Sequence, residues 1–190
     1  MGRLPWLDVH GPRRVAPAVA PGVRKLMLAV HLTSSVGWLG LLVAYIVLDL
    51  TVATNSDPQL VRAAWMGMGL LISSAIVPFA VTSLLTGIAI AAGTRWGLFR
   101  HWWVLISLLL TVFALLVLLS EAGVVARSAS IAADPATAPE SLLALPSTLP
   151  HSLGGLVVLL AIQTLNVYKP RGLTPYGWRK EHADRASRGL

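Results

Sequence analysis

The sequence places one histidine, His31, inside a long apolar run that begins after Arg24 and Lys25. Six residues separate His31 from Lys25, which corresponds to roughly 9 Å along a helix axis. An imidazole is costly in hydrocarbon and is a common ligand of metals and cofactors, so a histidine at this depth indicates function. The alternative is that His31 only forms a hydrogen bond with a neighbouring helix.

The run around His31 has two distinct faces if it is helical. At 100° per residue, one face carries most of the polar and aromatic groups of the run. The residues on this face are His31, Ser35, Trp38, Leu42, Tyr45 and Asp49. We expect this face to contact protein, because lipid offers no hydrogen-bond partners. Nearly opposite, small residues stand at a spacing that lets another helix approach closely, namely Thr33, Gly37, Gly40 and Ala44.

Two further residues are expected at the membrane depth of His31. His101 begins a later apolar run and is either a second metal ligand or a plain interfacial histidine. Gln163 precedes Tyr168 by five residues, hence by roughly 8 Å, and either orients the His31 ring or forms an ordinary interhelical hydrogen bond. His151 lies towards the other membrane face, where the polarity of a helix N-terminus accounts for it.

Four apolar segments must position these residues. A helix needs about 20 apolar residues to cross the hydrocarbon core, and such segments occur at about 26–48, 63–92, 102–119 and 149–168. Charged residues make up only 12% of the chain, whereas soluble domains carry about a quarter. We therefore predict an all-α, integral membrane four-helix bundle of up-and-down topology over residues 25–168, with tilt or a kink in the second segment, which holds Pro78.

The charges between these segments predict the orientation. Thirteen of the fifteen Lys and Arg residues lie before the first segment, between the second and third, or after the fourth, and only Arg62 and Arg127 lie opposite. The positive-inside rule then places both termini in the cytoplasm. We expect the net charge of +7 to meet anionic lipid, and not nucleic acid. Twelve Arg against three Lys favour a high-GC bacterium, and hence a multi-pass protein of its plasma (inner) membrane.

The remaining segments are predicted to be irregular. Residues 1–24 contain four prolines and are expected to be disordered, residues 169–190 to form a basic cytoplasmic tail, and the Ala-, Ser- and Pro-rich loop 121–146 to be mobile. Tryptophans favour bilayer interfaces, which predicts an inner belt of Trp96, Trp102 and Trp103 and an outer position for Trp65. Loose surface ion pairs at the outer helix ends are expected from Asp49, Arg62, Glu121 and Arg127.

Several kinds of chemistry are excluded or unsupported. The chain has no cysteine, which excludes disulfides, iron–sulfur clusters, zinc–thiolate sites and thiol catalysis. No acidic residue lies in the middle of an apolar segment, so a carboxylate proton relay is not predicted. Walker, nucleophile-elbow, HExxH and dinucleotide-binding motifs are absent. We therefore assign no catalytic residue, and the balance favours a protein that is not an enzyme.

Two short motifs carry a family resemblance. In the run HLTSSVGWLG, at residues 31–40, a tryptophan follows the histidine by seven residues and a glycine lies nearby. This resembles the start of HemJ-type protoporphyrinogen oxidases and CopD-type copper-resistance proteins. The run GTRWGLFRHWW, at residues 93–103, resembles a family of small bacterial four-span membrane proteins of unknown function. The HemJ resemblance implies a haem ligand at His31, although the third-span lysine of those proteins has no counterpart between residues 102 and 119.

These observations leave two functional hypotheses. The first is a non-enzymatic packing or accessory subunit that binds a second copy or other membrane proteins through the Gly37/Gly40 face. The second is a b-type haem in the cytoplasmic half of the bundle, serving electron transfer or redox sensing. The residues of this second site would be His31 and His101 as iron ligands, Arg95 and Arg100 against the propionates, and Gln163 beside His31.

Overall fold

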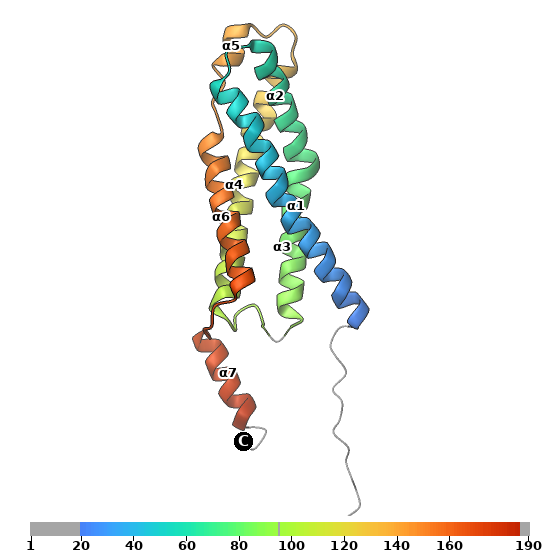
Figure 1. Cartoon of the computed structure of the whole chain (residues 1–190), viewed down its shortest axis with the longest axis vertical. Coiled ribbons are helices and arrows are strands. Elements are labelled where there is room, and N and C mark those ends of the chain that lie inside the picture. The colour runs from blue at the N-terminus through green and yellow to red at the C-terminus, as the bar shows by residue number, and fades with distance from the viewer. Residues whose placement is uncertain (1–19, 95, 187–190) are drawn as a thin grey trace, which may run out of the picture.

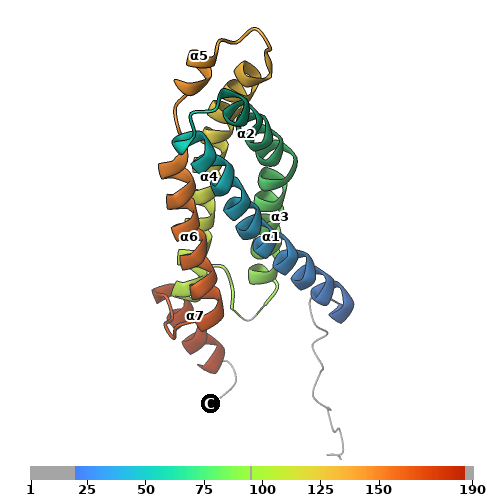
Figure 2. The same cartoon turned by 45° about the horizontal axis from the view of Figure 1, so that its top comes forward.

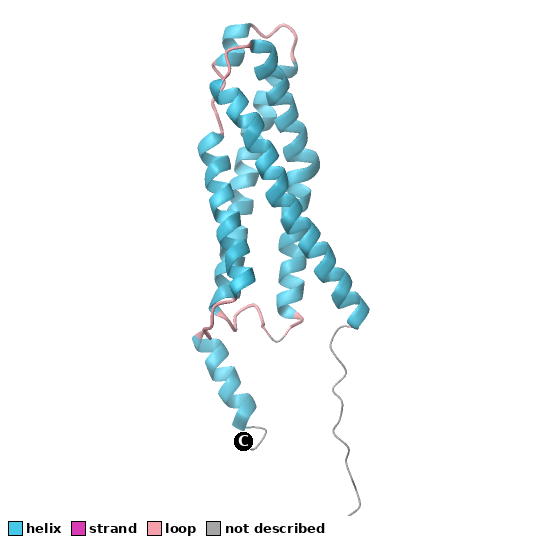
Figure 3. Ribbon diagram, viewed as in Figure 1, coloured by secondary structure: helices cyan, strands magenta, loops and turns pink. Residues whose placement is uncertain are grey.

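The computed structural model describes residues 20–94 and 96–186, and most of them are helical (Figure 1, Figure 3). In chain order the elements are α1 (Pro21–Thr54), α2 (Pro58–Leu71), the π-helical turn η1 (Ile72–Ile76), α3 (Val77–Ala92), α4 (Trp102–Ala133), α5 (Pro139–Leu143), α6 (Leu149–Tyr168) and α7 (Pro175–Ala186). Across the described ranges there is no strand, only one isolated antiparallel bridge between His101 and Leu173. The all-α prediction is confirmed.

Within the described ranges four helices are long and apolar enough to cross a membrane, as the sequence predicts: α1, the continuous α2–η1–α3 unit, α4 and α6. With 34 residues, α1 is roughly 51 Å long, well above the roughly 30 Å of a hydrocarbon core. It crosses the other helices obliquely, and its N-terminal half diverges from them (Figure 1, Figure 2). We call the two ends of the bundle the α5 end and the α7 end, after the short helices found there.

The outer surface of the four helices is apolar. Large side chains between 61% and 67% exposed occur on every one of them: Leu26, Leu70, Leu85, Leu116, Val157 and Val167. Soluble proteins rarely expose so continuous an apolar surface. Lipid tails accommodate it, while the helices satisfy their own backbone hydrogen bonds. The number, length and apolar surface of these helices are therefore those of a multi-pass membrane protein.

The four long helices close into a ring. Helix α1 packs against α2, α3 and α6, and α4 packs against the same three helices. The densest core lies towards the α5 end, where α5 packs on α2 and the side chains of Trp65, Met68, Val125 and Leu142 are at most 2% exposed. The α7 half of the ring is less completely filled, and this is where the main cavity lies.

The second segment, for which the sequence predicts tilt or a kink, contains the π-helical turn η1, which ends two residues before Pro78. Pro78 has no N–H group to bond the carbonyl of Ser74, so a regular α-helical ladder is interrupted here. The N–H of Val77 instead donates to the carbonyl of Ile72, five residues back. The wider turn absorbs the interruption and the helix continues as α3.

Three expectations differ from the structure. The loop 121–146, predicted to be irregular, is helical in α4 as far as Ala133 and again in α5. Its alanines favour helix, and Val125 and Ala132 are completely buried. Trp65, predicted at the outer interface, is also completely buried. The surface-pair expectation is wrong for Asp49, which is 0% exposed.

The two ends of the chain are partly helical. Of the segment 1–24, residues 21–24 belong to α1, and residues 1–19 lie outside the described part. The basic tail contains α7, whose first turn is capped by Thr174: its hydroxyl accepts from the N–H of Gly177 at 3.0 Å. The N–H of Thr174 donates to the carbonyl of Arg100 at 3.1 Å. This contact joins α7 to the loop between α3 and α4.

Candidate functional site

A cavity of about 380 Å³ lies within the ring towards the α7 end, and all four long helices contribute to its wall. Leucines supply much of the apolar lining, from α1, α3 and α4: Leu28, Leu32, Leu84 and Leu108. The polar groups of the lining include His31, Ser107, Gln163, Asn166 and Lys169. The volume falls in the range of roughly 300–1,000 Å³ that holds small molecules and cofactors.

His31 occupies this wall in a fixed orientation. Its Nδ1 atom lies 3.1 Å from the carbonyl oxygen of Ser83 and 3.1 Å from the hydroxyl oxygen of Thr86, both on α3. The Ser83 carbonyl can only accept, and the Thr86 hydroxyl lies 2.6 Å from the carbonyl of Thr82, to which it donates. The hydrogen of the ring is therefore on Nδ1. Among the described residues Nε2 has no hydrogen-bond partner, and its lone pair is available to a ligand.

The close approach of α3 to His31 depends on Gly87. A Cβ atom at this position would lie 3.1 Å from Cε1 of His31, tighter than ordinary van der Waals contact. The glycine thus leaves space for the imidazole between α1 and α3. Ser83 and Gly87, four residues apart on α3, both lie where α3 packs against His31 of α1.

Gln163 lies in the same cavity as His31 but does not set its tautomer. The two residues share the lining, yet the bonds to Nδ1 come from Ser83 and Thr86. Gln163 and Asn166 stand three residues apart on α6 and so lie on one face of that helix. They supply amide groups to the wall formed by α6.

His101 and Arg100 form hydrogen bonds at the α7 end of the fold and are not among the lining residues of the cavity. Nδ1 of His101 donates to the carbonyl of Trp96 at 2.8 Å, and the two rings meet edge to face. The carbonyl of Arg100 receives the N–H of Thr174. Trp96 itself lines the cavity, so His101 adjoins its wall. Arg95 lies outside the described residues.

One hydroxyl group in the cavity wall lacks a partner. Oγ of Ser107, on α4, is buried and has no hydrogen-bond partner among the described residues. Ser107 is 6% exposed and lines the cavity. A buried hydroxyl without a partner costs roughly 1–3 kcal/mol. A ligand or water in the cavity would remove that cost.

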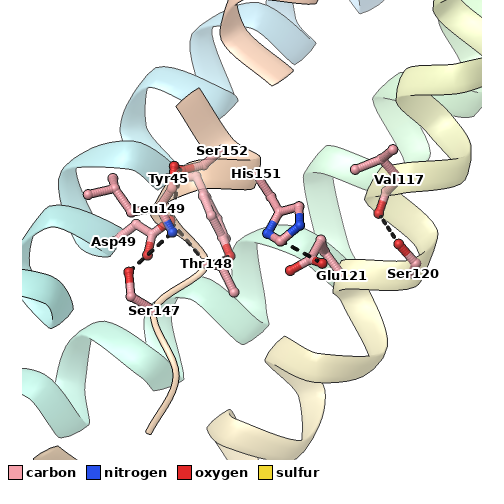
Figure 4. A network of polar contacts seen from close by, with 10 residues as sticks. All are labelled: Tyr45, Asp49, Val117, Ser120, Glu121, Ser147, Thr148, Leu149, His151 and Ser152. Carbon is pink, nitrogen blue, oxygen red and sulfur yellow. Dashed lines mark hydrogen bonds and ion pairs between the residues drawn. The ribbon is translucent and has the colours of Figure 1, made fainter. Parts of the chain in front are cut away.

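A second polar cluster lies nearer the α5 end, around the buried carboxylate of Asp49 (Figure 4). Its Oδ2 accepts from Thr148 Oγ1 at 3.0 Å and from Ser152 Oγ at 2.8 Å. Because the Thr148 hydrogen is used here, the hydroxyl of Tyr45, 2.9 Å away, donates to Thr148. Asp49 therefore holds the first turn of α6 against α1, where the helix dipole also favours a negative charge.

The same turn of α6 also contacts α4. Nδ1 of His151 lies 3.7 Å from Oε1 of Glu121 (Figure 4), so the helix N-terminus is joined to both neighbouring helices. A cavity of only about 60 Å³ adjoins this cluster, lined in part by Tyr45, Glu121 and His151. It has room for a few water molecules and no more. The sequence signal for the cluster was the position of Asp49 four residues after Tyr45 on the polar face of α1.

Fold and cavity together define a class: an α-helical multi-pass membrane protein with a cavity that is lined, among the described residues, by one histidine. Comparison with family models, with curated proteins and with solved structures found no match.

Proposed function

We propose that this chain binds a b-type haem in the cavity, with His31 Nε2 as the ligand to iron. The observation that carries the proposal is the difference in hydrogen bonding between the two ring nitrogens of His31. Nδ1 lies 3.1 Å from the Ser83 carbonyl oxygen, whereas Nε2 has no hydrogen-bond partner among the described residues, and the residue lines the cavity. Metal-ligating histidines almost always donate their other ring N–H to a carbonyl or carboxylate, which fixes the tautomer and increases ligand basicity.

The composition of the wall also fits a porphyrin. A macrocycle needs an apolar slot, which Leu32, Leu84 and Leu108 help to form, and its polar edge needs donors, which Gln163 and Asn166 supply. No described lining residue is acidic, so nothing there repels a carboxylate. The cavity volume of about 380 Å³ falls in the range of sites that hold cofactors.

The lining favours one of the two roles predicted for such a haem. His31 is the one histidine among the described residues that line the cavity. A haem held by a single histidine supplies reversible binding of small molecules at iron as well as a redox couple. We therefore place redox or gas sensing ahead of electron transfer, and His101 is not included as a ligand.

We further propose that the four helices form an up-and-down bundle in the plasma membrane of a bacterium, with both termini in the cytoplasm. The support is the distribution of charge, with thirteen Lys and Arg residues on one side and two on the other. In this orientation the α7 end, and with it the haem site, faces the cytoplasm.

Absorbance of the purified protein tests the haem proposal. Hemin added to the detergent-solubilised chain should produce a sharp Soret band that His31→Ala removes. His151→Ala, at the α5 end, is the matched control and should keep the band. Imidazole added to His31→Gly should restore it if the lost group is an iron ligand. A colourless wild-type protein, or a band unaffected by both His31 variants, would discard the proposal.

An accessory subunit remains the second candidate, because part of the small-residue face is open. Gly40 has no atom within 4 Å of where a Cβ would stand. It lies in a row of exposed residues on α1 that continues through Val36, Val43 and Val47. Such a flat, β-branched row fits the side of another transmembrane helix. Association through it is compatible with haem binding.

A further inference from the structure

The wall of the haem cavity has an unbalanced charge. Lys169 is the only Lys or Arg among the described residues that line it, and none of them is Asp or Glu. The ammonium of Lys169 lies 5.9 Å from the centre of the Trp96 ring. In the described part of the chain no carboxylate forms an ion pair with it. A ligand that brings its own negative charge would balance this end of the cavity.

The backbone at Lys169 is also unusual. This residue is the C-cap of α6 and has a φ of 45°, the one left-handed non-glycine position in the described residues. Glycine or asparagine is the usual choice for a left-handed cap, and a lysine there has a conformational cost. Its N–H still closes the helix by donating to the carbonyl of Leu165 at 2.9 Å. The cap geometry alone does not account for a lysine.

Polar groups continue from Lys169 along the same helix. Asn166 precedes it by three residues and Gln163 by six, and all three line the cavity. The walls contributed by α3 and α4 are predominantly apolar, and α1 adds Leu28 and Leu32 beside His31 and Ser35. An amphipathic ligand would therefore lie with its acidic edge against the end of α6 and its apolar body among the leucines.

We propose that Lys169 receives the carboxylates of the bound ligand, which are the two propionates if the proposed haem site is correct. This replaces Arg100, whose position outside the cavity wall does not suit that task, as the cation for the propionates. Gln163 and Asn166 add hydrogen bonds at the same edge. The three residues thus determine the orientation of the porphyrin in the cavity.

A comparison of two porphyrins tests this role. Iron protoporphyrin IX and its dimethyl ester both offer iron to His31, but only the free acid has charges for Lys169. Lys169→Asn removes the ammonium and retains a residue that tolerates the left-handed cap. Lys180→Asn, on α7 and outside the cavity wall, is the charge-matched control. Both titrations are followed by the Soret band in the same detergent.

We expect Lys169→Asn to weaken binding of the free acid about tenfold and to leave binding of the dimethyl ester unchanged. Lys180→Asn should change neither. Equal weakening of both porphyrins by Lys169→Asn would assign the residue to the helix cap and overturn the inference, as would an unaltered affinity for the free acid. If the wild-type chain binds neither porphyrin, the haem proposal fails and this inference fails with it.

Discussion

His31 on α1 donates its Nδ1 hydrogen to the carbonyl oxygen of Ser83 on α3, 52 residues further along the chain, at 3.1 Å. This bond connects two helices and also decides which nitrogen of the ring is free. A backbone carbonyl is a dependable partner, because its position is set by the helix and not by a rotamer. The second acceptor for the same hydrogen is the side-chain hydroxyl of Thr86. Unlike the carbonyl, this hydroxyl can be removed by mutation.

Thr86→Val should weaken the orientation of His31 without altering the size of the residue. The loss of one neutral hydrogen bond corresponds to about 0.5–1.5 kcal/mol, so hemin affinity should fall by a few-fold to tenfold. Thr82→Val is the matched control, because Thr82 does not line the cavity and its side chain has no hydrogen bond to His31. Equal effects of the two variants in a hemin titration would argue against any role of Thr86.

Gly87→Ala should displace the His31 ring more strongly. The new methyl group would meet Cε1 at 3.1 Å, so the ring has to move by a few tenths of an ångström. We expect a shifted Soret maximum and hemin affinity about 10- to 100-fold lower, as found when the support of a metal ligand is disturbed. Gly123→Ala, on α4 where a Cβ meets nothing within 4 Å, should leave both unchanged.

Asp49→Ala should destabilise the fold near the α5 end. The substitution leaves the hydroxyls of Thr148 and Ser152 without their shared acceptor. Hydrogen bonds to a charged group contribute about 1.5–3 kcal/mol each, so the melting temperature in detergent should fall clearly. Glu140→Gln, at an exposed position on α5, is the control. A melting curve unchanged by Asp49→Ala would mean that the cluster does not hold α6.

Arg62→Gln should loosen the C-terminal end of α4. The guanidinium donates to three carbonyl oxygens there, those of Ala132, Asp134 and Thr137, the last two at 2.7 and 3.1 Å. Hydrogen exchange of residues 131–137 should become faster by roughly tenfold if about 1.4 kcal/mol is lost. Arg127→Gln, exposed on α4, should leave this exchange unchanged, and equal rates in both variants would contradict the bracing role.

Gly37→Leu and Gly40→Leu should behave differently. A side chain at Gly37 collides with the ring of Phe79 within the same chain, whereas Gly40 has open space. We expect Gly37→Leu to lower thermal stability and Gly40→Leu to leave it unchanged. If the chain forms dimers through the exposed row on α1, crosslinking should decrease in Gly40→Leu. Undiminished crosslinking in Gly40→Leu would show that this row on α1 is not the dimer interface.

The sequence was sufficient to predict the membrane character of the fold. Long apolar segments and the shortage of charge require lipid as solvent, whatever the details of packing. The same reasoning found His31, because an ionisable group in such a segment stands out. It also placed His31 and Gln163 at one depth, and the structure puts both in one cavity. These results depend on composition and rise per residue alone.

The polar partners could not be predicted in the same way. Asp49 was expected at the surface because it lies just past residue 48, the predicted end of the first segment, but α1 continues to Thr54 and the hydroxyl groups that bond to Asp49 belong to Thr148 and Ser152. Likewise, the acceptor for His31 is a main-chain atom of Ser83, which no pattern of side chains reveals. Helix-to-helix register decides both contacts. That register depends on the π turn before Pro78, which sequence periodicity does not resolve.

The π turn at Ile72–Ile76 has a consequence for insertions and deletions in this chain. A helix rotates by about 100° for each residue, but a π turn takes up one residue more than an α turn, so the removal of one residue from η1 would restore a regular α turn and leave the orientation of α3 nearly unchanged. The removal of one residue between Pro78 and Ser83, beyond this turn, would instead rotate the following part of α3 by about 100° relative to α2. Ser83 and Thr86 would then leave His31, although no residue of the site had been substituted. The hydrogen bond that fixes the tautomer of His31 therefore depends on the number of residues between the π turn and Ser83.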